Sequence, residues 1–244
     1  MLRRKFPMIV DARYPDLAIS NGVVRCINDT LTGDLIIPEI LAGQTVKAIA
    51  VSGFENCKQL TSVTIPSTVK RIGHHAFCCC SNLQTVNLPE SLEQIQLCTF
   101  DSCCNLKSIV IPKTVLFIGY AAFASCLALS SIDLPDSIIE MDESVFMGSG
   151  LVSIRLPKEL KQLGKNIFLG CENLTSVELP PSLVSIGEGA FKMCRHLKTI
   201  SLPSSVTYIG DAAFNCCISL KSMKLPAQLS YTGKNSFWGC PFAE

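Results

Sequence analysis

The chain has 244 residues, of which 48% are hydrophobic and 17% are charged, and its formal net charge is +1 at pH 7. This composition is typical of a globular protein and excludes a disordered one. Lysine and arginine are scattered rather than clustered, so we expect no nucleic-acid partner. No stretch approaches the roughly 20 apolar residues of a membrane helix, so we also expect no membrane insertion.

The N-terminal segment, residues 1–34, is expected to cap the fold. Met1–Lys5 has the charge of the start of a secretion signal, but the apolar run after it is short, so no signal peptide is visible and the location stays open. Farther on, Leu17–Ile19 and Val23–Val24 flank Asn21-Gly22, a pattern typical of a β-hairpin. This hairpin would cover the first coil of the fold.

The chain repeats itself with a period of 23 residues. Each copy follows the pattern L-x-x-[VIM]-x-[LI]-P-x-x-[LVI]-x-x-aliphatic, usually followed by G and then by F-x-x-C, and one copy is a residue short. A unit of this length cannot bury its apolar side alone, so neighbouring copies must stack and share a core. The copies begin at Leu60, Leu83, Leu106, Leu129, Leu151, Leu174, Leu197 and Leu220. The sequence therefore predicts a β-rich solenoid of about nine coils over residues 35–244.

Within a copy, alternating residues predict a short parallel strand. Val63 and Ile65 would point inward, and Pro66 would end the strand because it has no amide hydrogen. The glycine after the second aliphatic pair, Gly73 in this copy, is expected at a corner that requires a positive φ. Ala76-Phe77 would then begin a short helical or turn segment.

Two columns of residues are expected to hold the coils together. A phenylalanine in each copy would stack on its neighbours in the core, and a cysteine follows it three residues later, with Ser149 in one copy. A position that accepts Cys or Ser favours small, buried, reduced thiols, although a secreted chain could bridge some of them. The predicted structural residues are Phe77, Phe100, Phe123, Phe146, Phe168, Phe191, Phe214, Cys80, Cys103, Cys126, Cys171, Cys194 and Cys217.

Metal and catalytic chemistry are not expected. His75, Cys79 and Cys104 resemble part of a zinc site, but no four-ligand set of familiar spacing is complete, so we expect no metal or cofactor. Cys194 and His196 stand close in sequence, but the repeat sends Cys194 inward, away from a base on the surface. We therefore expect no catalytic residues and no enzyme.

Outward-facing residues provide the candidate ligand site. One column along the main strands always carries a hydroxyl, which we expect to hydrogen bond across strands, with sugar recognition as the alternative. A second column is varied, and exposed apolar residues lie nearby; these favour an interface, with homotypic packing or misassigned core as alternatives. The candidate ligand-binding residues are Val110, Leu116, Phe117, Asp133, Ile139, Arg155, Glu178, Tyr208 and Tyr231.

The C-terminal residues have three interpretations. Trp238, Cys240, Pro241 and Phe242 follow the last phenylalanine of the repeat, Phe237. They either cover the last coil, make a contact with a partner such as a second copy of the chain, or stand where a longer array was cut.

With this motif, the chain resembles the BspA-like leucine-rich repeat family, also named after the treponemal repeat. The resemblance covers Gly33–Cys240 and includes the first copy, Gly33–Pro38, the Val46-x-x-Ile49 pair and Gly53–Cys57. It implies a curved array with the main strands on the concave side. It also implies a secreted or cell-surface adhesin that binds a host or matrix protein or a glycan. An intracellular interaction scaffold with reduced thiols is the alternative, because no secretion signal is visible.

Overall fold

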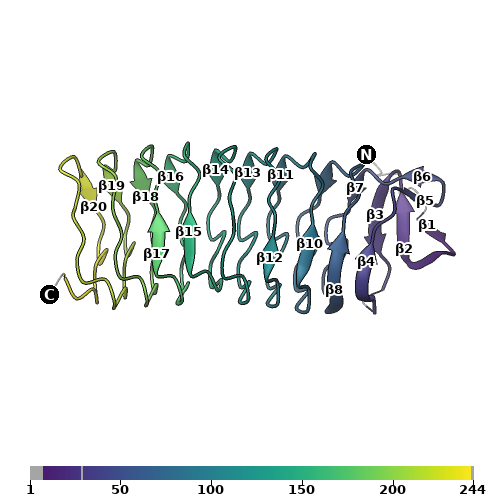
Figure 1. Cartoon of the computed structure of the whole chain (residues 1–244), viewed down its shortest axis with the longest axis horizontal. Helices are drawn as coiled ribbons and strands as arrows, with labels where there is room; N and C mark the ends of the chain where they lie inside the picture. The colour runs from purple at the N-terminus through teal and green to yellow at the C-terminus, as the bar shows by residue number, and fades with distance from the viewer. Residues whose placement is uncertain (1–7, 29, 243–244) are drawn as a thin grey trace, which may run out of the picture.

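A computed structural model describes residues 8–28 and 30–242, and its coils stand in one row along the long axis of the molecule (Figure 1). The basic stretch Met1–Lys5 lies outside the described residues. The predicted hairpin is confirmed: β2 (Tyr14–Ser20) and β3 (Val23–Cys26) pair antiparallel, and β1 (Ile9–Asp11) joins the outer edge of β2. Asn21 and Gly22 both have positive φ, as a tight hairpin turn requires.

The hairpin continues the solenoid rather than lying loosely on its end. β3 pairs in parallel with β7 (Ala48–Ile49) of the first coil, and Leu17 and Ile19 of β2 are fully buried. The first coil is longer than the others because a small antiparallel ribbon, β5 (Ile40–Leu41) and β6 (Gln44–Thr45), is inserted into it. The cap therefore buries its apolar residues against the end of the shared core.

The main strands form one side of the solenoid. They are β4 (Thr32–Ile36), β8 (Gln59–Thr64), β10 (Thr85–Asn87) and β12 (Ser108–Ile109), with β15 (Ser153–Arg155) and β17 (Ser176–Glu178) farther along. They pair in parallel within two sheets, and β8, β10 and β12 are in register, so that Thr85 lies opposite Ser62 and Ser108. Equivalent residues of successive copies therefore form straight columns, as the period predicts.

A second set of two-residue strands follows the proline of each copy. It comprises β9 (Arg71–Ile72), β11 (Gln94–Ile95), β13 (Phe117–Ile118), β14 (Glu140–Met141), β16 (Gln162–Leu163), β18 (Ser185–Ile186), β19 (Tyr208–Ile209) and β20 (Tyr231–Thr232). These second strands also pair in parallel between neighbouring coils.

The repeated phenylalanines form a continuous stack in the core. Neighbouring ring centroids from Phe54 to Phe237 lie 5.1–5.8 Å apart, and their planes differ by at most 19°. Every ring from Phe54 to Phe214 is fully buried, whereas Phe237 is half-buried. At the C-terminus Phe242 packs edge-on against Phe237, while Trp238 stays 65% exposed.

The segment around each phenylalanine is a turn, so of the two predicted forms the turn is confirmed and the short helix is wrong. The described residues contain no α-helix, and therefore none long and apolar enough to cross a membrane. In the second copy, the residues two before and two after Phe77, His75 and Cys79, have left-handed φ values of 55° and 60°. The amide of Phe77 donates to Thr99 in the next coil, so hydrogen bonds between coils replace those of a helix.

The corner glycines are required for a different reason than predicted. Gly73 does not have a positive φ, and neither do Gln96 and Asp142 at the same place in other copies, so the predicted positive φ at this corner is wrong. A Cβ added to Gly73 would lie 2.5 Å from the Val51 nitrogen and 2.7 Å from the Ala50 carbonyl carbon. Glycine is therefore needed where the backbones of neighbouring coils come too close for a side chain.

Candidate functional site

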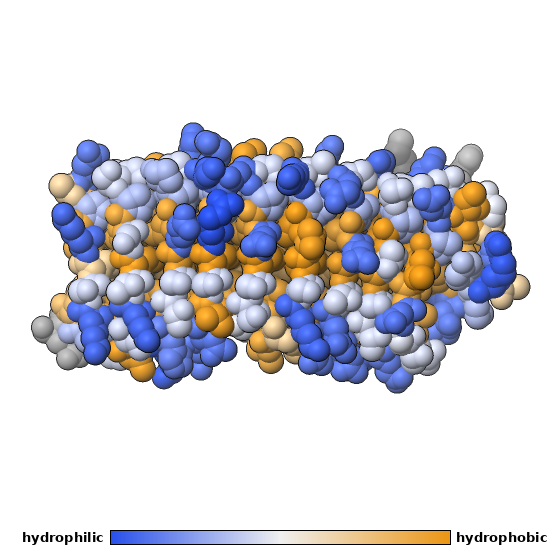
Figure 2. All heavy atoms as spheres, in the orientation of Figure 1, coloured by the Kyte–Doolittle hydropathy of each residue, from blue (hydrophilic) through white to orange (hydrophobic). Residues whose placement is uncertain are grey.

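The outward face of the main strands is hollowed in the C-terminal half of the molecule. Arg155 of β15 lies opposite Glu178 of β17, and Asp133 lies in the coil before them. These three side chains and the hydroxyls of the neighbouring column line a hollow of about 580 Å³. In Figure 2 a hydrophobic band (orange) runs along the array between rows of paler and blue residues.

Arg155 is held in place by an ion pair. Its guanidinium donates to the Asp136 carboxylate over 2.8 Å, and Lys158 lies 3.2 Å from the other Asp136 oxygen. These two cations lower the pKa of Asp136 to about 2, with the Arg155 hydrogen bond as the larger cause. Asp136 is therefore ionised at neutral pH and fixes the direction of the Arg155 side chain, which is still 44% exposed.

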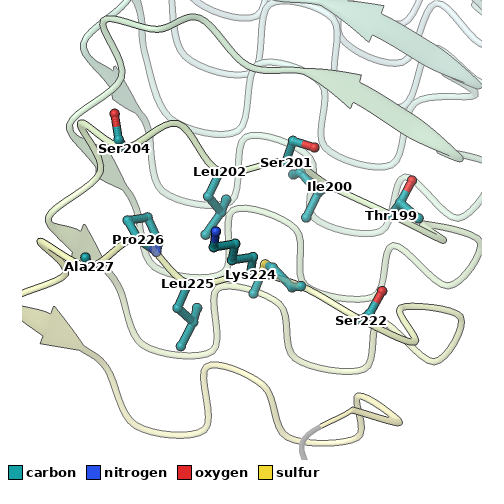
Figure 3. Close-up of a pocket in the computed structure, with 11 residues that line it drawn as sticks. Thr199, Ile200, Ser201, Leu202, Ser204, Ser222, Lys224, Leu225, Pro226 and Ala227 are labelled. Carbon is teal, nitrogen blue, oxygen red and sulfur yellow. The ribbon is translucent and has the colours of Figure 1, made fainter.

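A second, larger hollow of about 960 Å³ continues the first toward the C-terminus (Figure 3). Hydroxyls of Thr199, Ser201 and Ser222 line it together with Lys224, and the apolar part of its wall includes Leu202 and Leu225. The hollows share residues 199–201, so together they make one surface, which we call the main-strand hollow.

Leu202 and Leu225 were not predicted as surface residues. They directly precede the proline of their copies, at a position where the side chain is expected to face inward. At the same position in other copies, Ile65 and Ile111 are each only 5% exposed. Leu202 is half-buried and Leu225 is 42% exposed. Residue type alone gives no signal of this difference, because leucine also fills this position in buried copies.

The structure separates the predicted apolar residues between two sheets. Val110, 78% exposed, follows β12 on the side of the main strands. Leu116 and Ile139 lie beside each other in adjacent coils among the second strands, where the Ile139 amide donates to Leu116. Phe117 lies in β13 between Gln94 and Glu140 and is half-buried. The apolar residues of the second strands thus form a small group of their own, apart from the main-strand hollow.

Two exposed tyrosines lie still farther along the second strands. Tyr208 of β19 and Tyr231 of β20 stack with ring centroids 4.8 Å apart and planes 8° from parallel. The nearby Asp211 carboxylate raises the pKa of Tyr231, because it disfavours a second negative charge. Eight of the nine candidate residues therefore fall into three groups, and Val110 stands beside the main strands outside them. Of the three groups, only the main-strand hollow gathers charged side chains and hydroxyls.

Hydroxyls have two separate roles. In the outward column of the main strands, Ser62 donates to the Asp34 carboxylate over 2.6 Å, whereas later members line the hollow. A different column of hydroxyls, which sequence reasoning missed, ties coils together by donating to a backbone carbonyl of the preceding coil. Its members are Ser91, Thr114, Ser137, Ser182 and Ser205. The available signal was the pattern P-x-[ST] after the main strand, which occurs in most copies, with Glu159 and Gln228 at the third position in the other two.

The cysteine ladder is a column of buried hydrogen-bond donors. From Cys80 to Cys240 each ladder thiol donates to the carbonyl of the phenylalanine one coil earlier, at 2.9–3.2 Å. Ser149 takes the place of a thiol, and its hydroxyl lies 3.4 Å from the Cys171 sulfur. Burial raises the pKa of Cys171 to about 11 and that of Cys80 to about 12. These thiols are therefore protonated at neutral pH.

Among the described residues, the histidines and cysteines that the sequence singled out gather into neither a metal site nor a catalytic pair. In the part of the chain that the structure describes, no three His, Cys, Asp or Glu side chains gather to hold a metal ion. The Cys194 sulfur points into the core toward the Phe168 carbonyl, whereas His196 lies on the surface with Nδ1 2.6 Å from the Glu172 carbonyl. Cys194 and His196 therefore do not face each other as a catalytic pair would.

Comparisons with known proteins agree with this architecture. Residues 33–152 and 140–244 match the model of the BspA type leucine rich repeat region. A leucine rich repeat protein of T. pallidum is 31% identical, with a TM-score of 0.68 over 79% of this chain and 87% of that one. A leucine rich cell surface protein of Faecalibacterium prausnitzii is 23% identical, with a TM-score of 0.59 over 98% and 80% of the respective chains.

The comparison with curated proteins gives no match. The family match spans most of the chain, over the same residues that form the parallel coils and the buried phenylalanine stack of this structure. This fold generally serves protein interaction rather than catalysis. The chain belongs to the BspA-type leucine-rich repeat family.

Proposed function

We propose that this protein is a non-enzymatic interaction module that binds a protein or glycan ligand through the main-strand hollow. The proposal is carried by one observation: Asp133, Arg155 and Glu178 stand together on adjacent rigid coils and line a hollow with a column of hydroxyls. Strands that are already ordered lose little conformational entropy on binding, so the contacts translate more fully into affinity.

The chemistry of the hollow suits a ligand rich in hydrogen-bonding groups. Glu178 and Asp133 accept hydrogen bonds, Arg155 donates them, and the hydroxyls do both. The Asp136 ion pair fixes Arg155 before a ligand arrives. Leu202 and Leu225 add an apolar surface at one end. A sugar chain or an extended peptide offers this mixture of polar and apolar groups along its length.

The family favours an adhesin-like role at the cell surface, with a host or matrix protein or a glycan as partner. The F. prausnitzii relative of the same fold is described as a cell surface protein. A second candidate is an intracellular interaction scaffold with reduced thiols. It is favoured by the cysteine ladder, because each thiol that donates to a carbonyl must be reduced.

The test is a binding screen of the full chain against a panel of glycans and matrix proteins. Arg155→Ala and Glu178→Gln should each weaken binding of any captured ligand about tenfold, because each removes a charge-assisted hydrogen bond. Gln162→Ala on the second strands is the matched control and should bind as the wild type does. Circular dichroism verifies that all variants are folded.

The same screen can refute the proposal. If Phe117→Asp or Ile139→Asp abolishes binding while Arg155→Ala and Glu178→Gln keep it, the ligand site lies on the second strands. If only intracellular proteins are captured, and they are lost with Arg155→Ala, the scaffold role replaces adhesion while the main-strand hollow remains the site.

A further inference from the structure

Three cations gather beside the N-terminal cap, at one end of the row of coils (Figure 1). Lys47 directly precedes β7, and Lys70 and Arg71 stand at the start of β9 in the next coil. The Lys70 amide donates to the Lys47 carbonyl over 2.9 Å, so the two lysines occupy equivalent places in adjacent coils. Together with three hydroxyl side chains, the cations line a hollow of about 580 Å³, which we call the basic hollow. Its residues are Thr45, Lys47, Ser67, Thr68, Lys70 and Arg71.

The positive charge of the basic hollow is largely uncompensated. Lys47, Lys70 and Arg71 are exposed. Among the described residues, no carboxylate forms an ion pair with any of the three. The Glu39 carboxylate lies nearby, 3.5 Å from the Ser67 hydroxyl, and offsets the three cations only in part. The hollow therefore attracts an anionic ligand.

The long first coil and the hairpin fix one wall of the basic hollow. Gln44 of the β5–β6 ribbon accepts the Gly22 amide of the hairpin turn over 3.1 Å, which holds the ribbon beside the hairpin. The aliphatic part of Lys47 lies beside the same turn, because a Cβ added to Gly22 would be 3.4 Å from its Cγ and Cδ atoms. This wall is in place before a ligand arrives, so little order has to be gained on binding.

Thr68 supplies a hydroxyl that has no other use. It stands at the repeat position of the hydroxyls that tie coils together, where Ser91 donates to the Val69 carbonyl over 3.1 Å. The oxygen of the Thr68 hydroxyl is buried, yet it has no hydrogen-bond partner among the described residues. Rotation about the Cα–Cβ bond exchanges this hydroxyl with the methyl group of the same side chain. Thr68 can therefore turn its hydroxyl toward a ligand without breaking an existing hydrogen bond.

We propose that the basic hollow binds the sulfate groups of a sulfated glycan. Sulfate oxygens are ionised and accept hydrogen bonds, and the guanidinium, the ammonium groups and the hydroxyls of the hollow are donors. The volume of the hollow lies in the usual range for a small-ligand site, which suits a short stretch of a sugar chain. This inference does not depend on the proposed function, because the basic hollow lies among the second strands and the main-strand hollow does not.

A nucleic acid fits this surface less well. Proteins that bind single strands stack the bases on aromatic rings, and none of the six residues of the basic hollow is aromatic. A duplex requires positive charge along a row of phosphates. In the next coil, however, Glu93 takes the repeat position of Lys70, so the positive surface is short. A compact anionic group on a sugar is therefore the better match.

The test is calorimetric titration of the full chain with a heparin hexasaccharide at about 0.15 M salt, where distant charges are screened. We expect saturable binding, and Lys70→Glu and Arg71→Glu should each weaken it about tenfold. Both replacements suit the fold, because Glu93 and Glu140 occupy these repeat positions in other copies. Heparin from which the sulfates have been removed should bind at least about tenfold more weakly than heparin.

Two further variants separate a defined site from general charge attraction. Lys161→Glu is the matched control, because Lys161 has the repeat position of Lys70 but lies outside the basic hollow, and it should bind heparin as the wild type does. Thr68→Val keeps the shape and charge of the hollow but removes the hydroxyl, and should weaken binding about fivefold. Its midpoint of thermal unfolding should not fall, because the hydroxyl it loses is unpaired.

Four outcomes would overturn the inference. The first is no binding of heparin, or equal binding of heparin without sulfates. The second is an equal loss with Lys161→Glu and Lys70→Glu, which would mean general charge attraction. The third is a single-stranded oligonucleotide that binds as tightly as heparin and is lost with the same variants. The fourth is binding that Arg155→Ala abolishes and Lys70→Glu leaves intact, which would place the sulfated glycan in the main-strand hollow.

Discussion

The thiol of Cys194 donates a hydrogen bond to the carbonyl oxygen of Phe168, one coil earlier, over 3.2 Å. The same carbonyl also accepts the Cys171 amide over 3.0 Å, so the thiol occupies its second lone pair. This bond joins the cysteine ladder to the phenylalanine stack, because each thiol contacts the backbone of a stacked residue. The two columns that repeat most regularly in the sequence are thus parts of one connected core.

Replacing a ladder thiol should cost a measurable part of the stability. Cys194→Ala removes both the hydrogen bond and the packing of the sulfur, and we expect the free energy of unfolding to fall by about 1–3 kcal/mol. Cys194→Ser should cost less, because a hydroxyl can still donate and Ser149 already occupies this column. Urea unfolding measures both, with Cys216→Ala outside the ladder as the control. Equal losses for all three variants would contradict a specific role for the ladder bond.

The buried thiols should make the protein unstable in alkali. Cys80 has a pKa of about 12 in the folded chain against 9.0 for the unperturbed thiol. Below pH 9 both states are protonated. Between pH 9 and 12 the unfolded state binds fewer protons than the folded state, so the free energy of unfolding decreases as pH rises, by up to ~1.4 kcal/mol per pH unit for such a thiol. Urea midpoints at pH 8.5 and 10.5 measure the decrease.

The contribution of one thiol to this loss of stability at high pH can be isolated. Cys80→Ser removes that titrating group but keeps a small side chain with a hydrogen-bond donor. The decrease in the free energy of unfolding between the two pH values should therefore be smaller in Cys80→Ser than in the wild type. Lysines and tyrosines titrate equally in both proteins and do not cause this difference. An identical decrease in the two proteins would show that Cys80 does not contribute.

The phenylalanine stack should be most sensitive at its centre. Phe146 is fully buried and stacks on Phe123 and Phe168, with centroids 5.8 and 5.7 Å away. Phe146→Ala should therefore lower the free energy of unfolding by about 3–5 kcal/mol. Phe237→Ala is the control, because this ring is half-buried near the end of the array and should cost less. Comparable losses at both positions would contradict a continuous, shared core.

Much of the fold could be predicted because a single repeat period determines which residues of every copy are equivalent and face the same way. Once Val63 and Phe77 face inward in one copy, the equivalent residues of all copies must do so, and the structure confirms this solenoid. The hairpin around Asn21-Gly22 was equally clear, since few other structures suit that dipeptide. The local conformation at Phe77 was less clear, because Ala76-Phe77 is compatible with a helix until hydrogen bonds to the next coil are known.

The candidate site was harder to predict for a related reason. A period assigns residues to columns but does not give the distance between columns of one coil. Val110 and Leu116 therefore looked like neighbours, although Val110 follows β12 of the main strands and Leu116 precedes β13 of the second strands. The grouping of Asp133 with Arg155 and Glu178 was predictable, because they share one column. The exposure of Leu225 was not, because it depends on where the residue stands along the array.

The corner glycines allow a test of the close approach between coils. A side chain at Gly73 would meet the backbone of Ala50 and Val51 at 2.5–2.7 Å, and backbone cannot move aside as a flexible side chain can. We expect Gly73→Ala to lower the free energy of unfolding by about 1–3 kcal/mol, the usual cost of overpacking. Gln96→Ala is the matched control at the same repeat position, and should change stability by less than about 0.5 kcal/mol. If Gly73→Ala were as stable as Gln96→Ala, the glycine would not be needed to keep the coils this close.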